Sequence, residues 1–272
     1  MENVKIEEKT REEIENIEEV SNNICSPSLD FELEPHQMFV RNFLSFQTPY
    51  NSLLLFHGLG TGKTCSSISV CEDMRIYYKQ IGNKKKIMIV ASPNVQENYK
   101  LQLFDERKLR KINGLWNIKS CTGNKFIKEV NPMNMLGLSR EKIVKQINKI
   151  IKQSYEFIGY TEFSNQIERL TKNIKTGDKD KDKLRKIKLI KREFSNRLLI
   201  IDEVHNIRST SKEESRRTTQ NMLDLVKYSD NLKLLLLTAT PMFNDVREIV
   251  WLLNLMNIND KRFPIKIKDI FD

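Results

Sequence analysis

The sequence lacks any stretch that could cross a membrane or direct secretion. Its 272 residues contain no apolar run that approaches the roughly 20 residues a transmembrane helix needs. The N-terminus is acidic and has no apolar core of a signal peptide. With 39% hydrophobic residues and a mean hydropathy of −0.51, the composition predicts a soluble globular protein without a membrane partner.

The chain is also poor in metal-binding side chains, with four cysteines and three histidines. Cys25, Cys65, Cys71 and Cys121 are not spaced like the ligands of a metal site, and the histidines do not complete one. We predict four reduced thiols in a reducing, intracellular compartment. Cys65 is a candidate for oxidation, although a small buried side chain is the simpler interpretation.

Acidic residues do not balance basic ones. The net charge is +10, and the isoelectric point is about 9.3, which favours an anionic partner such as nucleic acid. A lysine-rich composition can also reflect coding bias, so charge alone does not establish nucleic acid as the partner.

A short apolar run followed by a glycine-rich turn predicts a phosphate-binding loop. Leu53–Phe56 has the continuous hydrophobicity of a parallel strand covered on both faces. The chain continues His57-Gly58-Leu59-Gly60-Thr61-Gly62-Lys63-Thr64, and such glycines allow a turn whose N–H groups cradle phosphate oxygens. Lys63 adds charge at the β- and γ-phosphates, and Thr64 offers a hydroxyl to Mg²⁺. We therefore predict that ATP and Mg²⁺ are bound by Gly58, Gly60, Thr61, Gly62, Lys63 and Thr64.

The loop departs from the P-loop pattern at His57, where the pattern has a glycine. This position lies at the entrance of the loop, so the phosphate chemistry is preserved. The alternative is a chance glycine turn. It is disfavoured because the strand before the loop and the helix after it stand where the mechanism needs them.

An acidic motif follows a second apolar run. Leu198–Ile201 leads into Asp202-Glu203-Val204-His205. Asp202 would hold Mg²⁺, directly or through water, and Glu203 would activate the attacking water. The simpler alternative is an acidic pair at a strand end. A third run, Leu234–Leu237, ends in Thr238-Ala239-Thr240-Pro241, whose hydroxyls could sense the nucleotide state; alone it is an ordinary strand exit.

These three motifs, in this order, resemble the first motor domain of superfamily 2 helicases and translocases. Lys63 and Thr64 match motif I, Asp202 to His205 match motif II as a DExH box, and Thr238 to Thr240 match motif III. Further segments resemble the helicase-like ATPases of large nucleocytoplasmic DNA viruses, the group that includes the poxvirus early transcription factor small subunit and nucleoside triphosphatase I. These segments are 34–37, 41–45, 91–98, 155–160 and 240–245.

The resemblance covers most of residues 31–270 and implies an α/β fold, a RecA-like parallel sheet flanked by helices. It places Gln37 where these proteins read adenine, with an exposed helix glutamine as the alternative. Ser92 and Asn94 fall in a loop that touches the nucleic-acid backbone, although a plain Ser-Pro-Asn turn explains the same residues. His205, Thr238 and Thr240 would couple nucleotide state to nucleic acid. Tyr160 could stack on a base, but a core tyrosine is the simpler interpretation.

Periodicity and caps predict the remaining elements. Pro35 opens a helix whose apolar face is Met38, Phe39, Phe43 and Leu44, and Ser139 caps another helix. The expected strands are 53–56, 87–90, 115–118, 155–160, 198–201 and 234–237. The expected helices are 64–78, 95–104, 139–152, from 162 onward, 215–228 and 246–256, with a turn at 122–124 and a polar loop at 206–214.

Composition divides the chain into three parts. Residues 1–28 are acidic and aromatic-free, which predicts a mobile tail or docking arm. The ATP-binding domain spans 29–260 and contains a basic insertion at 172–194, expected to be a charged turn and an exposed basic helix. That insertion is either a solvated surface or a phosphate-contacting rim. Residues 261–272 predict a connector.

The sequence contains no second RecA-like core and no motif VI, whose arginines reach the γ-phosphate in superfamily 2 motors. We therefore predict the N-terminal half of a nucleic-acid-dependent ATPase, with a second RecA-like domain in cis or in a partner chain. The resemblance favours a viral protein of the virion or infected-cell cytoplasm that works with transcription machinery on DNA or RNA. One alternative is a non-catalytic half-motor that binds nucleotide or a partner without turnover. The other, an unrelated P-loop ATPase, is disfavoured by the DExH and Thr-Ala-Thr-Pro motifs.

Overall fold

The computed structural model describes residues 32–58, 60–132, 137–172, 178–208, 212–242 and 246–270. The acidic segment 1–28 lies outside these ranges. Within them, no helix combines the length and the apolar character needed to cross a membrane.

The centre of the domain is a five-stranded sheet, in which every recorded strand pair is parallel. Its strands stand in the order β1-β7-β6-β2-β5. Their bounds are Ser52–Phe56 for β1, Ile87–Val90 for β2, Tyr155–Ile158 for β5, Leu198–Ile201 for β6 and Lys233–Thr238 for β7. The α/β architecture expected from the sequence is confirmed.

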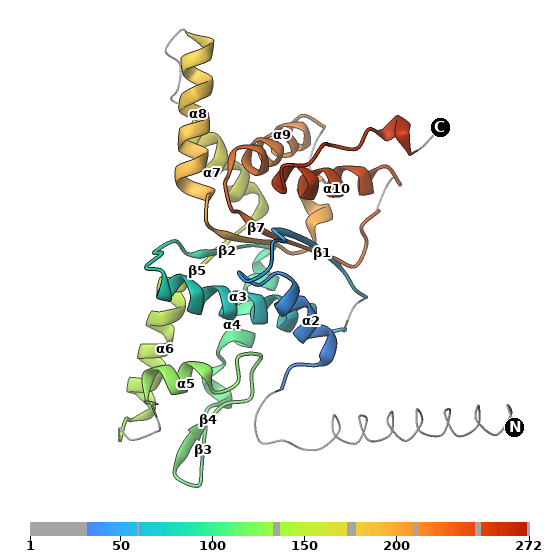
Figure 1. Cartoon of the computed structure of the whole chain (residues 1–272). Coiled ribbons are helices and arrows are strands. Elements are labelled where there is room, and N and C mark those ends of the chain that lie inside the picture. Colours follow the sequence, from blue (N-terminus) through green and yellow to red (C-terminus); the bar gives the residue numbers. More distant parts are fainter. Residues whose placement is uncertain are drawn as a thin grey trace, which may run out of the picture.

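Helices cover both faces of the sheet (Figure 1). One face carries α2 (Pro35–Phe43), α3 (Lys63–Gln80), α4 (Pro93–Leu103), α5 (Lys125–Val130) and α6 (Arg140–Ser154), and the other carries α7 (Tyr160–Lys172), α8 (Lys179–Phe194), α9 (Lys212–Tyr228) and α10 (Glu248–Asn259). Alternate strand side chains enter two separate hydrophobic clusters: Ile87 and Ile89 belong to one, and Met88 and Val90 to the other. Burial on both faces explains why these strands are uninterrupted apolar runs.

Parallel pairing brings the carboxyl ends of the strands to one edge of the sheet. The loops that leave β1, β2, β6 and β7 therefore meet there, and they carry the three sequence motifs and the Ser-Pro-Asn turn. Ligands of open α/β sheets bind at this edge.

Several short elements differ from the sequence-based expectation. The expected strand near 115 exists as β4 (Leu115–Asn117), but it pairs antiparallel with an unexpected β3 (Arg110–Ile112) outside the main sheet. The segment α5 and the 3-10 turns η1 (Glu106–Lys108), η3 (Val204–Arg208) and η4 (Ile267–Asp269) were not expected. Ser139 caps α6 as predicted, because its hydroxyl accepts from the backbone N–H of Lys142 at 3.4 Å.

The expected apolar face of α2 is wrong at two positions. Met38 and Phe39 are 44% and 65% exposed, whereas Gln37 and Val40 are buried. The helix turns its polar Gln37 inward because the glutamine carbonyl accepts a hydrogen bond from the backbone N–H of Glu34 at 3.2 Å.

The expectation of four free thiols is also wrong. Cys65, in the first turn of α3, is joined by a disulfide to Cys121, with 5.2 Å between the two Cα atoms. Cys71 is a free, buried thiol, and Cys25 lies outside the described residues. The bridge ties α3 to the segment that follows β4.

Candidate nucleotide site

The phosphate-binding loop is shaped by two glycines with positive φ. Gly60 and Gly62 have φ of +82° and +78°, in the left-handed region that other residues avoid. Gly62 also has a close neighbour, because a Cβ added there would lie 2.5 Å from Nε2 of Gln37. The loop therefore needs glycine at Gly62 for its backbone conformation, and an added Cβ would also displace the end of the Gln37 side chain.

Lys63 begins α3 and turns its side chain back into the loop. Its Nζ donates to the carbonyl oxygens of His57 and Gly58, at 2.8 and 3.3 Å. The hydroxyl of Thr61 donates to the same Gly58 carbonyl at 2.9 Å. These contacts hold the ammonium group at the mouth of the loop, where backbone N–H groups and the start of the helix favour an anion.

The acidic motif faces this loop from β6. The side chain of Asp202 is buried, and one of its carboxylate oxygens accepts from the backbone N–H of Glu203 at 2.9 Å. Burial raises the pKa of Asp202, and the charge of Glu203 raises it further, whereas Tyr99 and Lys63 oppose the shift. A buried carboxylate beside a lysine is suited to a divalent cation, which would stabilise the ionised form.

One cavity of about 370 Å³ joins the two motifs, and it is lined by Gly58, Gly60, Gly62, Lys63, Thr64, Cys65, Val95, Asn98, Gln102, Asp202 and Glu203. The oxygen donors of Thr64 and Asp202 suit Mg²⁺, which takes one or two protein ligands and completes its shell with phosphates and water. Lys63 and the loop N–H groups suit the phosphates of ATP. The side chains present therefore fit Mg²⁺·ATP.

The acidic motif is linked to the β7 motif through a histidine. Nδ1 of His205 lies 3.1 Å from Oγ1 of Thr238 and 3.4 Å from Oγ1 of Thr240. The same nitrogen is 3.4 Å from Oε2 of Glu203. His205 thus contacts both the carboxylate expected to activate water and the two hydroxyls that follow β7.

The residues expected to touch nucleic acid lie at the same edge of the sheet. Ser92 precedes α4, and Asn94 is exposed in its first turn. Tyr160 begins α7 and is half-buried. Its hydroxyl donates to the backbone carbonyl of Asp202 at 2.7 Å, and its ring packs against the hydrophobic cluster that contains Met88 and Val90. Contact of these residues with nucleic acid stays a prediction.

Sequence reasoning missed the contribution of α4 to the site. Asn98 and Gln102 line the nucleotide cavity. Tyr99 is fully buried, and its hydroxyl lies 2.9 Å from the hydroxyl of Ser67 on α3. Polar residues at 98 and 102 are one helical turn apart, which was the available signal. Nothing in the sequence singled out Tyr99.

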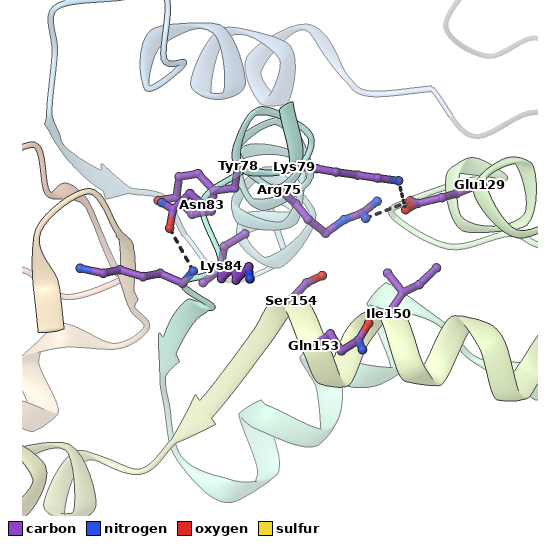
Figure 2. Close-up of a pocket in the computed structure, with 11 residues that line it drawn as sticks. Arg75, Tyr78, Lys79, Asn83, Lys84, Glu129, Ile150, Gln153 and Ser154 are labelled. Atoms are coloured by element: carbon purple, nitrogen blue, oxygen red, sulfur yellow. Dashed lines mark hydrogen bonds and ion pairs between the residues drawn. The ribbon is translucent and has the colours of Figure 1, made fainter. Parts of the chain in front are cut away.

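A second cavity, of about 340 Å³, lies at the opposite edge of the sheet, where α3, α5 and α6 meet (Figure 2). Its buried Arg75 is ion-paired with Glu72 and Glu129, at 2.8 and 2.9 Å, and Lys79 reaches Glu129 at 3.0 Å. Figure 2 shows Arg75 and Lys79 converging on Glu129. These charges satisfy one another, so the network joins α3 to α5.

A lysine-bearing glycine loop after one strand, and an aspartate–glutamate pair after another strand of the same parallel sheet, define a P-loop ATPase of the superfamily 2 helicase-like class. Within this class the chain belongs to the SNF2-related domain family, whose profile matches residues 36–262.

Similar proteins come from large DNA viruses. A protein of Acanthamoeba polyphaga mimivirus, named as an ATP-dependent RNA helicase, is 29% identical over 97% of this chain and 22% of its own length. A protein of Invertebrate iridescent virus 3, named as a helicase, is 28% identical over 86% of this chain and 21% of its own. An early transcription factor large subunit homolog of African swine fever virus is 23% identical over 83% of this chain and 23% of its own. This chain thus spans under a quarter of each of these relatives.

Among solved structures, the SWI2/SNF2 ATPase core of Sulfolobus solfataricus in complex with dsDNA aligns with a TM-score of 0.45 and 16% identity. The alignment covers 89% of this chain and 41% of that one.

Proposed function

We propose that this domain is the N-terminal motor domain of a nucleic-acid-dependent ATPase that binds ATP with Mg²⁺ and hydrolyses it. The observation that carries the proposal is the meeting of Lys63, Thr64, Asp202 and Glu203 around one cavity. Family membership supports it, because both motifs fall within the matched residues 36–262.

Each side chain of the site has a role in this proposal. Lys63 and the loop N–H groups bind and orient the phosphates, and Thr64 and Asp202 hold Mg²⁺, which supplies charge neutralisation when bound. Glu203 accepts a proton from the attacking water, for which a positioned base is worth roughly 10²–10⁴ in rate. His205 contacts Glu203 and the two threonines after β7, and these contacts support a role in reporting the nucleotide state.

The role in transcription and the viral setting belong to the same proposal. The viral setting rests on the organisms of the relatives, and the role in transcription rests on the name of the African swine fever virus protein. Ser92 and Asn94 are the proposed backbone contacts, with DNA or RNA as the bound strand, and a second RecA-like domain is the proposed partner in catalysis.

A second candidate is a domain that binds nucleotide without turning it over. One observation favours it: among the described residues that line the nucleotide cavity, Lys63 is the sole cation. Phosphoryl transfer in this class commonly uses an arginine finger worth 10³–10⁵ in rate. Hydrolysis would then require an arginine that comes from outside this cavity.

The test is steady-state ATP hydrolysis with and without DNA or RNA, measured alongside ATP binding. We expect Lys63→Ala to abolish ATP binding, because the phosphates lose their cation. Glu203→Gln should keep binding and lower hydrolysis by about 10²–10⁴. Glu106→Gln, an exposed carboxylate change on the turn η1 outside the nucleotide cavity, is the matched control and should leave both unchanged.

Turnover that rises with nucleic acid and is lost in both site variants supports the motor. ATP binding through Lys63 without turnover supports the second candidate. Hydrolysis that survives Glu203→Gln would refute the role given to Glu203.

A further inference from the structure

Half of the net charge of the chain is concentrated on one helix. The 16 residues of α8 carry eight Lys or Arg side chains and three Asp or Glu, a net charge of +5, against +10 for the whole chain. Figure 1 shows α8 extending away from the sheet, beyond the helices beside it.

Four of the exposed cations of α8 form one stripe, and one of them, Lys181, is also ion-paired with Asp178 at 3.3 Å. Lys181, Arg185, Lys188 and Arg192 are all exposed and follow one another at intervals of 4, 3 and 4 residues. At 3.6 residues per turn, they lie within a sector about 60° wide and along about 16 Å of helix. The opposite side carries Ile190 and Phe194, which are buried in the cluster shared with α7 and α9.

The base of α8 is firmly held. Nζ of Lys85 donates to the carbonyl oxygens of Arg192 and Ser195, at 2.6 and 2.7 Å. Two further cations of the helix are ion-paired with neighbouring segments, Lys186 with Asp224 at 2.5 Å and Lys191 with Asp230 at 2.9 Å. The stripe is therefore presented on a fixed support, which lowers the entropy cost of binding a partner.

We propose that this stripe, Lys181, Arg185, Lys188 and Arg192, binds the phosphate backbone of duplex nucleic acid. Phosphates of one strand recur every 3.4 Å along a duplex, so about 16 Å of helix can face about five of them. The two guanidinium groups bind phosphate oxygens in bidentate fashion. A single strand is disfavoured because such sites use stacking aromatic rings, and the one aromatic residue of α8, Phe194, is buried.

Charge alone does not distinguish α8, because Lys142, Lys145, Lys149 and Lys152 make a similar exposed stripe on α6. Two features separate the helices: α6 has no arginine in its stripe, and α8 packs against α7, which begins at Tyr160. The hydroxyl of Tyr160 donates to the backbone carbonyl of Asp202. A change in the position of α8 on binding can therefore be transmitted to the acidic motif, through α7 and the hydrogen bond from Tyr160 to Asp202.

The inference about the α8 stripe rests on the proposed function, because it adds a nucleic-acid contact to the same nucleic-acid-dependent ATPase. The experiment compares three forms of the 272-residue chain: the wild type, an α8 variant with all four cations of the stripe changed to Gln, and an α6 variant with its four lysines changed to Gln. Both variants lose four charges from exposed helix positions, and glutamine favours helix. Binding of a labelled 30-base-pair duplex is measured across a salt series, with ATP hydrolysis and thermal unfolding in parallel.

We expect the α8 variant to reduce the slope of log affinity against log salt by about 3–4, at roughly 0.9 per phosphate contact, and to weaken stimulation of hydrolysis by the duplex. The α6 variant should keep the wild-type slope, and basal hydrolysis should match in all three. Equal slopes in the two variants would overturn the proposal while leaving the proposed function intact. A wild type that binds no nucleic acid would overturn both.

Discussion

At the scale of single residues, the site depends on two backbone positions that most side chains avoid. Gly62 has φ of +78°, and Glu203, which is not a glycine, has φ of +45°. A non-glycine residue in this region costs about 1–3 kcal/mol and persists where the surroundings hold it. Glu203 has this backbone conformation between Asp202, the proposed Mg²⁺ ligand, and His205, and its carboxylate is the one proposed to activate water.

Gly62→Ala should destabilise the domain and weaken ATP binding. The left-handed backbone alone costs an alanine about 1–2 kcal/mol, and the new methyl group would meet Nε2 of Gln37 at 2.5 Å. The measurement is urea unfolding together with ATP affinity. Gly137→Ala is the control, because an added Cβ there has no neighbour within 4 Å and Gly137 does not line the nucleotide cavity. Adding Gln37→Ala to Gly62→Ala should recover part of the lost stability, although not the ATP affinity, because Gln37 is the expected adenine contact; no recovery of stability would show that the steric contact contributes nothing.

The pKa of Asp202 predicts how stability varies with pH. Burial raises this pKa in the folded state, so folding disfavours the ionised carboxylate. The penalty is absent below the ordinary carboxyl pKa of about 4, where both states are protonated, and it is complete above the raised folded value. Without nucleotide or Mg²⁺, Asp202→Asn should therefore be more stable than wild type at neutral pH, and its advantage should fade as the pH falls.

Denaturant unfolding at several pH values tests this, with Asp269→Asn on the exposed turn η4 as the matched control. A wild type as stable as Asp202→Asn throughout would contradict the expected burial penalty.

At the scale of elements, long apolar runs were predictable from the sequence and short or distant features were not. The predicted runs 87–90 and 198–201 have the same bounds as β2 and β6. Burial on both faces makes every residue of these strands apolar, so the run itself marks the ends of the strand. By contrast, β3 and α5 have three and six residues, too few for a periodicity. Tyr99 lies near the site because α4 packs on α3, which the sequence does not indicate. The Cys65–Cys121 pairing depends on tertiary structure and could not be predicted from the spacing of the cysteines.

The disulfide between α3 and the segment after β4 should contribute measurably to stability. It closes a loop with a sequence separation of 56 residues, for which the chain-entropy account gives about 4 kcal/mol. Treatment with a reductant should lower the unfolding midpoint of the wild type, whereas Cys121→Ser should begin low and not respond. Cys71→Ser, which removes the free buried thiol, should leave the response intact. A wild type indifferent to reductant would show that the bridge does not form in solution.

At the scale of the whole molecule, one sheet separates two hydrophobic clusters and collects the functional loops at one edge. The cluster around α3 supports the phosphate loop, and the cluster around α7–α10 supports the acidic motif and α8. Strand β6 contributes to both clusters, Leu198 and Ile200 to one and Leu199 and Ile201 to the other. The element that forms the nucleotide cavity, α3, and the helix that carries the stripe, α8, therefore pack on opposite faces of the sheet at the same strand, β6.

The pairing of β1 with β7 has a consequence for synthesis on the ribosome. In the described sheet β1 is an edge strand whose one neighbour is β7, and Leu53 pairs with Leu235, 182 residues later (235 − 53). At 5–20 residues per second, the strand before the phosphate loop waits roughly 10–40 s for this neighbour to be translated. During that interval the Leu53–Phe56 run is an unpaired apolar segment that a chaperone can bind, and the nucleotide cavity is completed only near the end of the domain.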